Sequence, residues 1–139
     1  MLRGDVYRFR VPKSVGHEQH GERFGVVVQA DEFLPRSVVI VAPTSRSAKS
    51  ASFRPEVEIA GETTRVLVEQ IGAVDARGLG RLSGHLSPEE MWGVDEALMT
   101  VLDLDRRRML QSRRWERDTR RLDRRVSERI RAVRPNAPA

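Results

Sequence analysis

The chain has 139 residues, of which 39% are hydrophobic and 5% aromatic, and it contains no cysteine. This length predicts one domain, or one domain with an appendage, and the composition excludes disulfides, a thiol nucleophile and thiolate zinc sites. No apolar run has the length of a signal peptide or approaches the roughly 20 residues of a membrane span, so we expect a soluble, cytoplasmic protein without a membrane partner.

The net charge of +5 is distributed unevenly. Residues 1–104 carry 12 Lys/Arg and 15 Asp/Glu, a net charge of −3, whereas residues 105–139 carry 13 Arg and 5 Asp/Glu, a net charge of +8. A mildly acidic body with a strongly basic tail points to a nucleic acid or an acidic protein as partner. The alternative is a solvated helix surface, rich in arginine through codon bias, because only 2 of the 25 basic residues are lysine.

Strand patterns dominate the first half of the chain. Residues 4–11 alternate in hydrophobicity, which is typical of a half-buried strand, and Pro12 ends the run. Residues 24–29 and 37–42 are almost continuously apolar. We therefore expect these two runs to be central strands that are covered on both faces.

Three shorter segments complete the predicted sheet. Residues 57–59 predict a fourth strand, residues 61–64 a turn, and residues 65–71 a fifth strand. Short strands separated by glycine and proline turns favour a mainly β fold, a small antiparallel barrel or sandwich.

A helix should follow the barrel and pack on it. Ser87 is a capping hydroxyl, Pro88 fits the first helical turn, and Glu90 completes a capping box. One face of this helix is apolar. Its residues are Met91, Val94, Leu98, Val101 and Leu102.

The basic tail predicts an extra C-terminal helix over residues 105–133, followed by a frayed end over 135–139. A narrow apolar stripe recurs at helical spacing along it. The stripe consists of Trp115, Thr119, Leu122, Val126, Ile130 and Val133. Such a helix is not expected to be stable alone, so it should dock on a neighbour or pair with its copy in a dimer.

Three short motifs carry the functional signal. Residues 16–24 read Gly-His-Glu-Gln-His-Gly-Glu-Arg-Phe, residues 42–45 Ala-Pro-Thr-Ser, and residues 68–71 Val-Glu-Gln-Ile. In this order they resemble the MazF/PemK family of ribosome-independent messenger-RNA endonucleases, the toxins of toxin–antitoxin pairs. The resemblance spans about residues 3–104. It implies a MazF/PemK-like endoribonuclease domain over residues 1–104, on a small SH3-like antiparallel barrel of the CcdB/PemK/MazF type. The tail has no place in the family pattern.

The resemblance implies catalytic roles for Arg23 and Thr44, and Glu18 of the first motif is a third catalytic candidate. Arg23 lies at the end of the loop in the first motif, and its planar fork of donors can grip two phosphate oxygens. Thr44 offers a hydroxyl to a phosphate oxygen, although Pro-Thr-Ser alone would be read as a turn. Glu18 can serve as the base, orient Arg23, or be simply solvated.

Five further residues are candidates for RNA binding. His17 and Gln19 lie in the first loop, Ser45 follows Thr44, and Gln70 belongs to the Glu-Gln pair that ends the fifth predicted strand. Ser45 also suits a local turn, and Gln70 a polar strand end. Phe24 can stack on a base or belong to the core.

The three histidines and two departures from the family pattern add no catalytic residue to this set. Histidine titrates near neutrality, which invites an acid–base role for His17 and His20, but loop solubility or RNA contact fits both better. His85 lies before the helix cap and should be structural. Three dispersed histidines without cysteine make neither a zinc site nor any cofactor site. The family commonly has arginine where this chain has Gly72, and proline where it has Phe24.

These patterns predict a metal-independent, sequence-specific endonuclease of single-stranded RNA. By resemblance it would act through the ribose 2′-OH, leave 2′,3′-cyclic phosphate and 5′-OH ends, form a homodimer, and be neutralised by an acidic antitoxin. The alternatives are a non-catalytic poison of a protein target, like the gyrase inhibitors, and a nucleic-acid-binding module on the same barrel.

Overall fold

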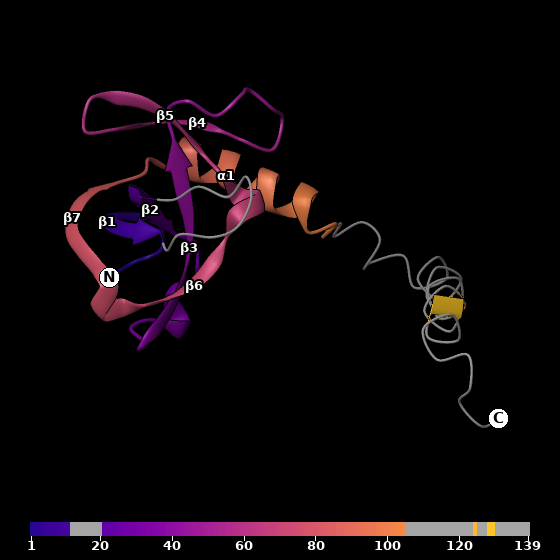
Figure 1. Cartoon of the computed structure of the whole chain (residues 1–139), viewed down its shortest axis with the longest axis horizontal. Coiled ribbons are helices and arrows are strands. Elements are labelled where there is room, and N and C mark those ends of the chain that lie inside the picture. Colours follow the sequence, from indigo (N-terminus) through magenta and orange to yellow (C-terminus); the bar gives the residue numbers. More distant parts are fainter. Residues whose placement is uncertain (12–20, 105–123, 125–127, 130–139) are drawn as a thin grey trace. The chain divides into compact units, whose positions relative to one another are not determined.

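The computed structural model describes residues 1–11 and 21–104, together with Arg124, Glu128 and Arg129, which are helical (Figure 1). The chain divides into two units, residues 1–104 and 105–139. The rest of the predicted tail helix and frayed end lies outside the described residues.

The first unit is a strongly curled antiparallel sheet (Figure 1). Neighbouring strands follow the order β4-β5-β3-β2-β1-β7, and β6 pairs with β3. The strands are β1 (Asp5–Val11), β2 (Gly21–Val27), β3 (Val38–Ser45), β4 (Glu56–Ile59), β5 (Glu62–Val66), β6 (Gly72–Asp75) and β7 (Leu79–His85). Helix α1 (Pro88–Val101) follows the sheet. This half-barrel with one helix confirms the predicted fold class for the first unit.

Successive residues of a strand point to opposite faces, so the central strands supply two separate apolar clusters. Val26 packs in the first cluster with Val94 and Ala97 of α1. Val27, its neighbour, packs in the second cluster, whose members are Phe9, Val27, Val39 and Val41. The central strands are thus covered on both faces along most of their length.

The first half of β3 departs from this expectation. Val38 is 51% exposed and Ile40 is 41% exposed, so there the strand is covered on one face only. A continuous apolar run cannot show by itself that both faces are buried, since an exposed valine or isoleucine looks the same in sequence.

The start of α1 is capped as predicted. Ser87 Oγ accepts a hydrogen bond from Glu90 N at 3.1 Å, and Glu90 Oε2 accepts one from Ser87 N at 2.9 Å. The other oxygen of Glu90 accepts from the backbone N–H of Glu58 on β4, at 2.8 Å. Helix and sheet therefore share one carboxylate.

The apolar face of α1 is shorter than predicted. Met91 and Leu98 pack against the first cluster, but Val101 and Leu102 are exposed. None of the described helices is long and apolar enough to cross a membrane.

Several predicted boundaries are wrong. The turn between β4 and β5 is made by Ala60 and Gly61, with φ of 53° and 79°, so β5 begins at Glu62 rather than after residue 64. The chain then enters the 3₁₀ helix η2 (Val68–Gln70), and the predicted strand does not reach residue 71. In addition, β2 starts at Gly21, and β6 and β7 were not predicted.

Candidate active site

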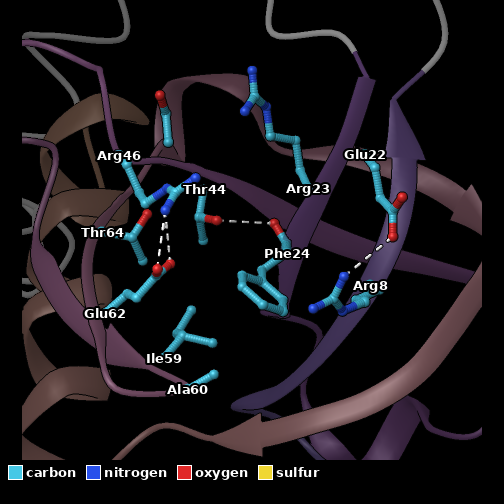
Figure 2. Close-up of a pocket in the computed structure, with 11 residues that line it drawn as sticks. Arg8, Glu22, Arg23, Phe24, Thr44, Arg46, Ile59, Ala60, Glu62 and Thr64 are labelled. Atoms are coloured by element: carbon cyan, nitrogen blue, oxygen red, sulfur yellow. Dashed lines mark hydrogen bonds and ion pairs between the residues drawn. The ribbon is translucent and has the colours of Figure 1, made fainter.

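A cavity of about 430 Å³ opens at the end of the sheet where β1, β2 and β3 meet the β4–β5 hairpin (Figure 2). Its walls combine three arginines and two glutamates with hydroxyl and apolar side chains. They are Arg8, Glu22, Arg23, Phe24, Thr44, Ser45, Arg46, Ile59, Ala60, Glu62 and Thr64. The cavity thus brings together Arg23, Thr44, Phe24 and Ser45, which the sequence proposed as site residues.

Arg23 is held by β2, opposite Phe9 of β1 in the antiparallel register. It is half-buried, and its Nε atom is buried without a hydrogen-bond partner among the described residues. A buried donor without a partner loses its hydration and gains nothing in return. Arg23 therefore presents a cation and an unsatisfied donor to any anion that enters the cavity.

The two other arginines of the cavity are paired. Arg8 Nη1 lies 3.4 Å from Glu22 Oε1, and Arg46 Nη1 lies 2.9 Å from Glu62 Oε2. All four side chains are more than half exposed. Of the cavity arginines, Arg23 alone has no carboxylate partner in the part of the chain that is described.

Thr44 is the penultimate residue of β3 and faces Val66 of β5 in the register. It is only 3% exposed, and its Oγ1 donates a hydrogen bond to the backbone carbonyl of Phe24, at 3.3 Å. Pro43, Thr44 and Ser45 therefore continue the strand, so the alternative of a simple turn is wrong. This hydrogen bond fixes the Thr44 hydroxyl beside β2 at Phe24, the neighbour of Arg23 in the sequence.

For Phe24, the sequence left open a place in the core or stacking on a base. Phe24 packs against the first cluster, and it also lines the cavity. Arg8 lies directly opposite on β1, with its Cζ atom 5.2 Å from the centroid of the Phe24 ring. This cation–π contact holds the guanidinium against the ring. Arg23 and Phe24 leave β2 in opposite directions (Figure 2).

Comparison with known families gives these residues a context. Residues 2–102 match the family model of the PemK-like, MazF-like toxins of type II toxin–antitoxin systems. The match covers well over half of the chain. The chain belongs to the PemK/MazF toxin family.

Two relatives agree with this assignment. The chain is 40% identical over 109 residues to Rv3098A of Mycobacterium tuberculosis, whose name describes a candidate toxin, and the match covers 75% of this chain and 99% of the relative. It is 36% identical over 111 residues to the endoribonuclease EndoA of Bacillus subtilis, covering 73% and 94%.

Solved structures share the fold of this PemK/MazF chain. MazF from Deinococcus radiodurans matches with a TM-score of 0.65 at 19% identity, over 75% of this chain and 97% of the other. An endoribonuclease from a mycobacterial species, solved with its cognate antitoxin, matches with a TM-score of 0.63 at 21% identity, over 76% and 97%.

The remaining predicted residues of the family motifs fall in three groups. Ser45 is buried, and its hydroxyl serves the chain itself, accepting from Ala48 N at 3.1 Å and bonding Ser47 Oγ at 3.3 Å. Gln70 lies in η2 and does not line the cavity. Glu18, His17 and Gln19, like His20, lie outside the described residues.

The Glu-Gln pair of the family motif lies in η2 instead of ending a strand, and Glu69 anchors a loop. Glu69 Oε1 accepts a hydrogen bond from Arg54 Nε at 2.6 Å, and Arg54 Nη1 also donates to the carbonyl of Lys49 at 3.1 Å. The loop after β3 is thereby fastened to η2.

His85 has the structural role that was expected. Its Nδ1 lies 2.9 Å from Asp5 Oδ1, which joins the end of β7 to the start of β1. Burial of Asp5 would raise the pKa of its carboxyl, but hydrogen bonds from His85 and from Leu2 N outweigh burial and lower that pKa. The same carboxylate, together with burial, raises the pKa of Tyr7.

The sequence analysis missed Arg8 and Arg46 as cavity residues. Arg8 looked like an ordinary outward residue of an alternating strand, and only its register with Phe24 brings it to the cavity. Arg46 does carry a signal, because it directly follows the Thr-Ser motif. Across residues 1–11 and 21–104, no three His, Asp or Glu side chains gather in a way that could hold a metal ion.

Proposed function

We propose that this chain is a toxin that cleaves single-stranded RNA at short specific sequences. The observation that carries the proposal is Arg23, a cavity arginine without a carboxylate partner among the described residues, beside the buried hydroxyl of Thr44. Membership of the PemK/MazF family and the endoribonuclease EndoA as a relative support the same reaction.

In the proposed reaction the ribose 2′-oxygen attacks the adjacent phosphorus and loses its proton to a base. The bond between phosphorus and the 5′-oxygen breaks, and this oxygen takes up a proton. The products are a 2′,3′-cyclic phosphate and a 5′-OH end. Negative charge grows on the non-bridging oxygens in the transition state, so preorganised donors contribute most to the rate.

Arg23 is the main donor in this scheme. Its guanidinium can hold two non-bridging oxygens at once, and an incoming phosphate would satisfy the Nε donor that the described residues leave unpaired. Because the side chain is half-buried, its charge is screened less than that of an exposed arginine.

Thr44 is the second donor. Rotation of its hydroxyl away from the carbonyl of Phe24 would direct the proton to a phosphate oxygen. We propose Glu18 as the base or as the residue that orients Arg23, with His17 and Gln19 as RNA contacts in the same loop. Phe24 offers a ring for stacking on a base next to the scissile bond.

The test is incubation of the purified protein with a long single-stranded RNA in the presence of EDTA. We expect discrete cleavage sites, 5′-OH ends that a kinase labels without prior phosphatase treatment, and no activity for Arg23→Ala. Binding without cleavage would favour the nucleic-acid-binding module. The absence of both binding and cleavage would favour a poison of a protein target.

The proposal includes two partners. An acidic antitoxin would occupy the cavity, in line with the mycobacterial endoribonuclease solved with its cognate antitoxin. A second copy of the chain would complete a homodimer. Light scattering of the purified chain measures whether it is a dimer. RNA cleavage measured with and without the antitoxin tests whether the antitoxin blocks the cavity.

A further inference from the structure

Three of the described arginines line the cavity, and two of these are held by glutamates of the same cavity wall. Arg8 pairs with Glu22 and Arg46 pairs with Glu62, while Arg23 has no such partner among the described residues. The paired arginines lie on either side of Phe24 and Thr44 (Figure 2). Among the described residues, the cavity therefore offers one arginine without a carboxylate partner and two arginines that each already donate to a carboxylate.

The nature of these pairs suggests that they are exchangeable. Ion pairs between exposed side chains are weak, and all four side chains are more than half exposed. A phosphodiester offers an arginine the same oxygen acceptors as a carboxylate does. A phosphate that approaches Arg8 or Arg46 can thus replace the glutamate with little loss.

The position of each arginine is also restrained without its glutamate, through the side chain for Arg8 and through the neighbouring backbone for Arg46. The cation–π contact of 5.2 Å with Phe24 holds Arg8 at the cavity. Arg46 directly follows Ser45, whose hydroxyl fixes the turn by accepting from Ala48 N. Loss of the glutamate would therefore leave the Arg8 guanidinium against Phe24 and the backbone at Arg46 in its turn beside the cavity.

We propose that Arg8 and Arg46 bind the phosphates that flank the scissile phosphate, and that Glu22 and Glu62 occupy these arginines until RNA arrives. The inference rests on the proposed RNA cleavage and adds a binding site on each side of the reacting phosphate. The glutamates act as competitors of the substrate. Removing a glutamate charge should strengthen RNA binding, which a purely structural ion pair would not do.

The experiment measures binding of a 2′-O-methylated RNA that contains a sequence cut by the wild type, because the methyl group blocks the nucleophile. Arg8→Gln and Arg46→Gln should each weaken binding about 1.5- to 5-fold, the range expected for one exposed ion pair. Each should also reduce the slope of log affinity against log salt by about 0.7, the value for one single-strand phosphate contact.

Arg77→Gln is the matched control. Arg77 also forms an exposed arginine–carboxylate pair, 2.8 Å from Asp75, but it does not line the cavity. Arg77→Gln should leave the affinity for the RNA and the salt slope of binding unchanged. Glu62→Gln and Glu22→Gln should tighten binding about 1.5- to 5-fold, and thermal unfolding should confirm that every variant is folded.

The outcomes separate the two proposals. If the wild type fails to cut the unmethylated RNA, the proposed function falls and this inference falls with it. If the wild type cuts but Arg8→Gln and Arg46→Gln bind like Arg77→Gln, only the inference is overturned. Weaker binding by Glu62→Gln and Glu22→Gln would also overturn it, because the ion pairs would then support the site instead of competing for it.

Discussion

Adding a methyl group at Gly25 tests how closely β1 and β2 pack beside Arg23. A Cβ atom at Gly25 would lie 2.6 Å from Cε1 and 2.8 Å from Cδ1 of the Phe9 ring. This is about 1 Å closer than a favourable carbon–carbon contact of ~3.5–4.0 Å. The ring is 8% exposed and packs in the second cluster, so it cannot move aside without disturbing that cluster.

The expected loss follows from two opposing effects. Overpacking a core typically destabilises by about 1–3 kcal/mol. Replacing glycine by alanine also restricts the unfolded chain, which stabilises the folded state by about 0.4–1 kcal/mol. We therefore expect Gly25→Ala to lower the free energy of unfolding by about 1–2 kcal/mol.

Urea denaturation at constant m-value measures this loss. Gly72→Ala is the control, because a Cβ atom at Gly72 meets nothing within 4 Å, and it should be neutral or slightly stabilising. Phe9→Leu should itself destabilise by on the order of 1–2 kcal/mol. The double variant Gly25→Ala with Phe9→Leu, however, should lose less free energy of unfolding than the two single variants lose together, by about 1 kcal/mol or more. Additive losses of the free energy of unfolding, or a Gly25→Ala variant as stable as Gly72→Ala, would refute the close contact between residue 25 and the Phe9 ring.

Three further predictions concern catalysis, pH dependence and the tail. Arg23→Lys and Thr44→Val should each slow RNA cleavage by about 10²–10³-fold, since each removes a donor aimed at the phosphate; a rate within tenfold of wild type would contradict the assignment. Asp5→Asn should destabilise the chain by about 1–3 kcal/mol at neutral pH. The pKa of Asp5 is lowered below its ordinary 3.8, so the contribution of its carboxylate to the free energy of unfolding is complete above that value and is lost as the pH falls through the lowered pKa. The difference between Asp5→Asn and wild type in urea denaturation should therefore shrink in acid and not stay constant. A chain truncated after Leu104 should cut the same RNA sites with weaker binding and a shallower salt dependence; unchanged affinity would instead assign the tail to antitoxin binding or dimer support.

The parts of the fold that could be predicted are those in which local chemistry decides the conformation. Alternation located β1, and the Ser87 cap located α1 almost to the residue. In contrast, β7 carries two glycines and mostly exposed side chains, so its sequence has no strand pattern. Its conformation depends on pairing with β1, which is far away in the sequence.

The candidate site shows the same division. Family motifs led to Arg23 and Thr44, and the structure brings both to one cavity. Arg8 reaches that cavity through the register of β1 against β2, which no local pattern specifies. The family resemblance made Gln70 a candidate for RNA binding at the end of a strand over residues 65–71, whereas Gln70 lies in η2 and does not line the cavity.

The carboxylate of Glu90 links the start of helix α1 to the edge strand β4. One oxygen caps α1, and the other accepts the outward N–H of Glu58 on β4, the last strand of the sheet on that side. Edge strands with unpaired N–H groups are where foreign strands attach and aggregation starts. A strand that added itself to β4 at Glu58 would have to displace the Glu90 carboxylate and so disturb its half of the capping box of α1. Sheet extension at this position is therefore opposed by the stability of the chain's own helix.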